Sequence, residues 1–163
     1  MRNSGDPEIS EPSEYEILNI GWRRREAAYG VLAQQQNAIN KAVLLAALAQ
    51  ADIDTASVSF DGYGDEGRIE HVAAHAKDAE VSIPPIAVSL QRVEYHTLKI
   101  MAVEETLAEA LGAMAEDLLD QSHRYWEDGD GAYGQVVFDV AGDRIVVNFN
   151  ARVTVSHASE HVI

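Results

Sequence analysis

The amino-acid sequence predicts an α+β fold, in which two long helices pack on one face of an antiparallel sheet of about four strands. Two long segments repeat apolar residues with helical periodicity, and shorter segments alternate apolar and polar residues as half-buried strands do. The apolar face of such a sheet must be covered, and the two amphipathic helices are the elements available to cover it. The length of 163 residues fits a single domain.

Two helices are predicted, at 22–51 and 104–125. Apolar residues recur in both at steps of three and four, and the first helix ends in a stretch rich in alanine, a strong helix former. Glu104 and Glu105 suit the positive N-terminal end of the second helix. Arg23–Arg25 would lie in the first turn of the first helix, where the dipole disfavours cations. We therefore expect these arginines to contact acidic groups of the N-terminal tail or of a partner.

Two strands are predicted at 55–60 and 68–76, on either side of a long acidic loop at 61–67. Residues 77–89 contain two consecutive prolines and are expected to be irregular. Residues 88–101 fit neither the helical nor the strand period, so the sequence leaves their structure open.

The segment 135–150 predicts a hairpin around Gly142–Asp143, with a two-residue turn of the type II′ kind. The pairs expected in this register are Val140 with Ile145, Phe138 with Val147, and Val136 with Phe149. All six residues are apolar and would share the buried face, whereas Asp139, Arg144 and Asn148 would lie on the other face.

Residues 1–14 are rich in proline, serine and acidic residues, so we expect a disordered acidic tail before a single domain at 15–163. The sequence contains neither a secretory signal nor a long apolar run, which favours a cytoplasmic protein with no membrane partner. The lack of cysteine excludes disulfides, thiol catalysis and cysteine-ligated zinc. A net charge of −15 disfavours direct binding to nucleic acid.

Two acidic, glycine-rich segments, 61–67 and 127–134, contain most of the candidate functional residues. Aromatic residues beside carboxylates suit a protein-binding surface, whose candidates are Tyr63, Asp65, Glu66, Trp126, Asp128, Asp130 and Tyr133. Clustered carboxylates also suit a divalent cation, whose candidate ligands are Asp61, Asp65, Glu70, Glu127 and Asp130. A further candidate set, which could bind a transition metal or act as acid and base, is His71, His75, His123, His157 and His161. The ordinary alternatives are two solvated turns and a Trp126 that caps the core.

The segments that carry a family resemblance are Asp61–Glu70, Leu119–Glu127, Gly131–Gly134, Asn148–Arg152 and a tail with His157, Glu160 and His161. In these segments the chain resembles an uncharacterised bacterial family that is known only as a domain of unknown function. The resemblance covers about residues 55–76 and 103–163. It implies a bacterial cytoplasmic protein whose genes occur on plasmids and integrative elements of alphaproteobacteria. It transfers no activity to this chain.

Acidity, the lack of catalytic motifs and this family context predict a non-enzymatic protein-binding module without a cofactor. The partner expected for such a mobile-element or anti-defence factor is a basic host protein, for example a DNA-binding one. The alternative is a metal-dependent hydrolase or a Ca²⁺-stabilised domain that binds a divalent cation with the two acidic segments. No G-x-S-x-G, Walker-type or H-E-x-x-H motif is present, which weighs against an enzyme.

Overall fold

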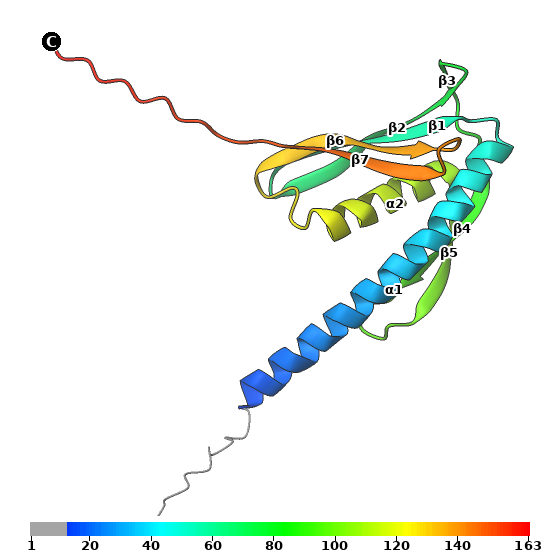
Figure 1. Ribbon diagram of the computed structural model, residues 1–163, viewed down its shortest axis with the longest axis horizontal. Helices are drawn as coiled ribbons and strands as arrows, with labels where there is room; N and C mark the ends of the chain where they lie inside the picture. The colour runs from blue at the N-terminus through cyan, green and yellow to red at the C-terminus, as the bar shows by residue number, and fades with distance from the viewer. Residues whose placement is uncertain (1–12) are drawn as a thin grey trace, which may run out of the picture.

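The computed structural model describes residues 13–163, which form the predicted α+β fold with helices packed on one face of an antiparallel sheet (Figure 1). The main sheet has five strands in the order β3-β2-β1-β6-β7, and β4 and β5 form a separate two-stranded sheet. The elements are, in chain order, α1 (Glu14–Gln50), β1 (Thr55–Gly64), β2 (Glu66–Ala76), β3 (Ala79–Val81), β4 (Ala87–Val93), β5 (Ile100–Thr106), α2 (Leu107–Ser122), β6 (Gly129–Asp139) and β7 (Arg144–Ala151).

Helix α1 begins at Glu14 rather than at Trp22, because a capping box starts it. The Ser13 side chain accepts a hydrogen bond from the Glu16 N–H, and the Glu16 carboxylate accepts one from the Ser13 N–H. These bonds hold the pKa of Glu16 below its usual value. Most of the predicted tail, 1–14, lies outside the described residues, and its last two residues belong to the helix start.

The earlier helix start corrects the expectation for the three arginines. Arg23–Arg25 lies well inside α1, so the unfavourable dipole of the first turn does not act on it. Within the described chain Arg25 donates a hydrogen bond to the carbonyl of His96, between β4 and β5.

The segment 61–67 is the end of a hairpin, not the long loop that was predicted. Strand β1 runs to Gly64 and β2 begins at Glu66, so that Tyr63 pairs with Glu66. Gly64 takes a φ of 72°, a left-handed conformation that glycine adopts without strain in a tight turn. The second acidic segment is also largely strand, because β6 pairs with the same end of β1.

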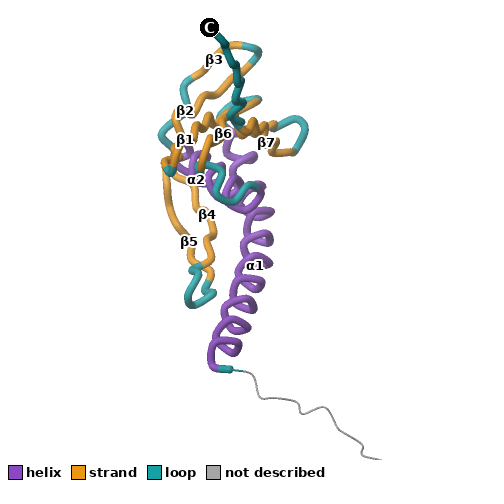
Figure 2. Tube along the Cα trace, turned by 90° about the vertical axis from the view of Figure 1, so that its left-hand side faces the viewer, coloured by secondary structure: helices purple, strands orange, loops and turns teal. Residues whose placement is uncertain are grey.

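The middle of the chain, which the sequence left irregular or open, contains β3 and most of the β4–β5 hairpin. This hairpin packs beside α1, away from the main sheet (Figures 1 and 2). Glu104 lies in β5 and not at a helix start, because α2 begins at Leu107. A second capping box, between Thr106 and Glu109, starts α2 at this point.

The predicted β6–β7 hairpin is confirmed, but its register is displaced by two residues. Asp139 pairs with Arg144, and the turn between them has four residues, with a positive φ of 48° at Asp143. The Asp139 carboxylate accepts hydrogen bonds from the Gly142 N–H and from Arg144, which favours this wider turn. Because side chains alternate with a period of two, the displacement keeps the apolar residues on the predicted face.

The core lies between the sheet and the helices. Its largest fully buried side chains include Phe60 and Phe138 from the sheet, Leu44 and Leu48 from α1, and Leu111 from α2. Each contributes about 1.5–3 kcal/mol through burial, before the entropy of ordering is subtracted. Alternate residues of β1 are buried, so the opposite face of this strand points away from the core. Both acidic segments lie at one end of β1.

Candidate functional site

Trp126 fills the space that two glycines leave on the inner face of the β1–β2 hairpin. It is 7% exposed and meets Phe60 edge to face at 5.3 Å. A Cβ built on Gly62 would lie 2.7 Å from the indole ring, and one built on Gly67 would lie 2.8 Å from it. Trp126 therefore belongs to the core, and it is not available as the surface anchor that the sequence suggested.

Arg152, which follows β7, contacts residues of both acidic segments. Its guanidinium bonds both carboxylate oxygens of Asp61, at 2.8 and 3.0 Å, and donates to the carbonyl of Gly62 at 2.8 Å. It also lies over the ring of Tyr133, 4.8 Å from the centroid. The hydrogen bonds from Arg152 hold the pKa of Asp61 below its usual value. Asp61 is thus ionised and already paired, as a structural group would be.

The chain after Arg152 is held in the same way by Asp130. Its carboxylate accepts hydrogen bonds from the N–H and the hydroxyl of Thr154, both at 2.8 Å. Arg152 and Thr154 were not among the candidates drawn from the sequence, although Arg152 closes one of the segments that carry the family resemblance.

We expect Arg152→Lys to loosen the C-terminal segment, because an ammonium group cannot form the bidentate bond to Asp61 or stack on Tyr133 as a guanidinium does. Hydrogen exchange at the Thr154 amide, followed by NMR, should become about tenfold faster while the amides of the core keep their protection. Arg144→Lys is the matched control, since Arg144 pairs with Asp139 at the far turn of the same sheet. Equal exchange at Thr154 in both variants would contradict this role of Arg152.

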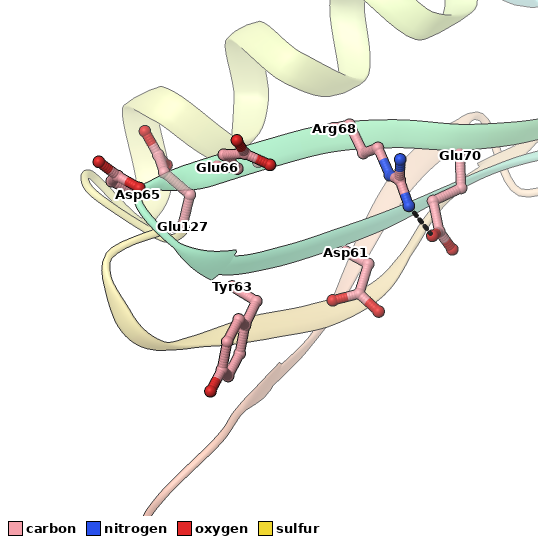
Figure 3. A pocket seen from close by; sticks show the side chains of 8 residues that line it. Asp61, Tyr63, Asp65, Glu66, Arg68, Glu70 and Glu127 are labelled. Carbon is pink, nitrogen blue, oxygen red and sulfur yellow. Dashed lines mark ion pairs between the residues drawn. The ribbon is translucent and has the colours of Figure 1, made fainter.

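Four of the five candidate metal ligands, Asp61, Asp65, Glu70 and Glu127, line one shallow hollow, whereas Asp130 does not. Asp61 and Asp130 are bonded as described above, and Glu70 lies 3.8 Å from Arg68 (Figure 3). Within residues 13–163, no group of three or more histidine or acidic residues is placed to hold a metal ion. Of the histidines, His71 lies 4.0 Å from Glu80, and His123 stacks on Phe149.

The remaining candidates gather at the free end of the β1–β2 hairpin. Asp65, Glu66 and Glu127 lie close together at one end of the hollow, which Asp61, Tyr63, Arg68 and Glu70 line further along the hairpin. The side chain of Tyr63 projects away from the first three (Figure 3). Tyr63 is 73% exposed and Tyr133 is 47% exposed. Neither Asp65 nor Glu66 forms an ion pair with another residue of the described chain. One carboxylate oxygen of Glu127 is buried and has no hydrogen-bond donor within the same part of the chain.

A second group of polar side chains lies between α1, α2 and β4, and no sequence pattern pointed to it. Asn40 is buried and exchanges two hydrogen bonds with the backbone of Gln91, at 2.8 and 2.9 Å. Gln36 and Asp117 line the same small cavity. Burial raises the pKa of Asp117 to about 6, and the nearby Arg92 opposes this rise.

The fold and the site together define a small acidic α+β domain whose exposed candidate residues lie at a hairpin end. The family model of DUF6878, a family of unknown function, matches residues 36–163, and the chain belongs to this family. The resemblance to a domain of unknown function is thereby confirmed. The match begins inside α1, so the first part of that helix lies outside it. Neither the curated proteins nor the solved structures gave a match. Neither helix of the described chain has the length and apolar character needed to cross a membrane.

Proposed function

We propose that the protein is a non-enzymatic binding module whose acidic tip engages a basic segment of another protein. The acidic tip comprises Tyr63, Asp65, Glu66, Asp128 and Tyr133. The observation that carries the proposal is that Tyr63, at the end of a tight hairpin, is 73% exposed. At the same hairpin end, Asp65 and Glu66 have no ion-pair partner in the described chain. A rigid aromatic side chain flanked by charge supplies contact area at a low entropic cost, as binding anchors do.

The chemistry of the tip suits an arginine or lysine of the partner. Arg152 already pairs with a carboxylate and stacks on Tyr133 within this chain, which is the geometry that an incoming arginine would use beside Tyr63. The exposed carboxylates of Asp65 and Glu66, which have no ion-pair partner in the described chain, would accept hydrogen bonds from such a group. The net charge of −15 would steer a basic partner towards the molecule.

The partner we propose is a basic protein of the bacterial cytoplasm, such as a DNA-binding or defence protein. Proteins that bind phosphate backbones present clustered lysine and arginine, which is the surface that an acidic tip complements. This protein would then act as a mobile-element or anti-defence factor.

The binding test uses a fluorescent peptide rich in arginine and lysine, whose anisotropy is measured with the full-length protein at low and high salt. The tip variant is Tyr63→Ala with Asp65→Asn and Glu66→Gln. We expect the Kd of this variant to rise at least about tenfold, since it loses one anchor and two carboxylates. Binding of the wild-type protein should weaken steeply as salt is added.

The matched control changes the net charge by the same amount elsewhere, with Asp78→Asn on the β2–β3 turn and Glu104→Gln on β5, both exposed. It should bind the peptide nearly as the wild type does. An equal loss in both variants would show that only total charge matters and would overturn the assignment of the tip. Absence of binding at low salt would overturn the proposed function itself.

A further inference from the structure

A cleft lies between α1 and α2, and the β4–β5 turn and the loop that leads from α2 to β6 complete its walls. Its volume is about 510 Å³, which is within the usual range of small-molecule sites. Tyr29, Tyr95 and Tyr125 line the cleft, and the first two rings meet edge to face at 5.2 Å. Tyrosine rings arranged around a cleft suit a cation or an aliphatic chain.

The charge of the cleft is negative. Among the described residues, four carboxylates line it, those of Glu26, Asp117, Asp120 and Glu127, together with one arginine, Arg124. Arg124 is already paired with Glu26. The other three carboxylates form no ion pair within residues 13–163. The cleft therefore favours a ligand that brings positive charge.

At its inner end the cleft meets a second, smaller cavity of about 80 Å³ between the two helices and β4. Tyr29 and Asp117 line both cavities, so the two meet beside these residues. Gln36 lines the inner cavity and is only 6% exposed, and its side-chain oxygen has no hydrogen-bond donor in the part of the chain that the structure describes. A buried acceptor without a donor is costly, so a ligand that donates a hydrogen bond here is favoured.

The groups at the inner end select the kind of cation. Asp117 and Gln36 both present oxygen acceptors, which a primary ammonium group with three N–H donors satisfies and a quaternary ammonium group does not. Arg92 also lines the inner cavity, but its charge is compensated, because it donates two hydrogen bonds to the carboxylate of Glu105, at 3.1 and 3.3 Å. An ammonium group beside Asp117 is therefore compatible with this arginine.

A second carboxylate lies one helical turn further along α2. Asp117 and Asp120 are three residues apart, so they are neighbours on one side of the helix, with Cβ atoms about 5–6 Å apart. Burial raises the pKa of Tyr29, and the carboxylates of Asp117 and Asp120 add to this rise, so both lie near its ring. Two like charges at this spacing repel each other, and a ligand with two positive charges would relieve the repulsion.

We propose that the cleft binds an aliphatic diamine or polyamine. One ammonium group donates hydrogen bonds to Asp117 and Gln36 where the two cavities meet, and the second pairs with the exposed Asp120. The carbon chain between them lies along the rings of Tyr29 and Tyr95. A lysine side chain of another protein offers the same ammonium group but not the second charge. This inference goes beyond the proposed function, because the cleft and the acidic tip share no residue.

The first test is a calorimetric titration of the full-length protein with cadaverine, an aliphatic diamine with five carbons, at pH 8 and low salt. We expect saturable binding to the wild type and a Kd at least about tenfold higher for Asp117→Asn, which loses the ionised acceptor. The matched control is Asp78→Asn on the β2–β3 turn, which removes the same charge from an exposed position and should change the Kd by less than about twofold. No saturable binding to the wild type, or equal losses in the two variants, would overturn the proposal.

Two further ligands test the chemistry of the site with the wild-type protein alone. Cadaverine with three methyl groups on each nitrogen keeps both charges but has no N–H donor, so its Kd should be at least about tenfold higher. Equal binding of this analogue would show that only charge attracts the ligand and would overturn the site. Acetyl-lysine amide carries a single ammonium group and should also bind more weakly than cadaverine. An equal affinity for it would overturn the assignment to a diamine and indicate a lysine of another protein.

Discussion

Gly131→Ala is expected to destabilise the protein severely, by about 3–5 kcal/mol, which is at the upper end of single-residue effects. Gly131 takes a φ of 75°, and a Cβ at this position would lie 1.8 Å from the carbonyl oxygen of Gly62. A backbone carbonyl cannot move aside as a flexible side chain does, so the substitution would separate β6 from β1. The clash would fall on Gly62, and Gly62 is also the residue whose missing side chain leaves space for the Trp126 ring.

Gly64→Ala is the matched control for this variant. Gly64 has a similar φ of 72°, but a Cβ there would meet nothing within 4 Å. Only the strain of a left-handed alanine remains, which costs about 1–2 kcal/mol. At about 2–4 °C per kcal/mol for a chain of this size, we expect thermal midpoints lower by about 2–8 °C for Gly64→Ala and by at least about 6–12 °C for Gly131→Ala. Similar losses in the two variants would show that close packing of β6 on β1 is not the cause.

Asp117→Asn is expected to stabilise the protein at pH 8. Burial raises the pKa of Asp117 from 3.8 to about 6; Arg92 opposes this rise, and Asp120, Glu116 and Glu105 add to it. The folded state therefore binds the proton of Asp117 more tightly than the unfolded state does. The stability that the protonated carboxyl group of Asp117 provides is fully present below about pH 4, and it is lost as the pH rises through about 6. Asparagine resembles the protonated acid at every pH, so the variant does not suffer this loss.

The shift of about two pKa units corresponds to a gain of up to about 3 kcal/mol at pH 8, and to no gain at pH 4. Urea unfolding of the wild type and of Asp117→Asn at pH 4, 6 and 8 measures this difference directly. The exposed Asp120→Asn serves as the control, because it removes an equal charge from the same helix. We expect it to change the stability by less than about 0.5 kcal/mol. A gain for Asp117→Asn that does not depend on pH would contradict the assignment.

Much of the fold follows from local patterns. The alternation in Thr55–Phe60 and in the last hairpin was sufficient to identify which residues are buried, because a period of two assigns each side chain to a face. The two capping boxes, Ser13 with Glu16 and Thr106 with Glu109, are also visible in the sequence. They would have corrected both helix starts, because each pairs a hydroxyl with a glutamate three residues later. The β6–β7 turn was misjudged because a displacement by two residues preserves the pattern on which the register was based.

The candidate site was less predictable, because its contacts join distant parts of the chain. Clustered acids and glycines drew attention to the end of the β1–β2 hairpin, where Tyr63 is exposed. The sequence could not show that Arg152 neutralises Asp61 across a separation of 91 residues. Nor could it show that Trp126 covers two glycines from inside the sheet.

The sequence by itself therefore determined the class of fold, the faces of the strands and the acidic character of the hairpin end, because composition and periodicity act locally. Only the tertiary structure decided which acids have an ion-pair partner among residues 13–163 and which have none there. It also decided that the first turns of α1, with their exposed apolar side chains, extend beyond the rest of the domain, since burial depends on which segments meet in space.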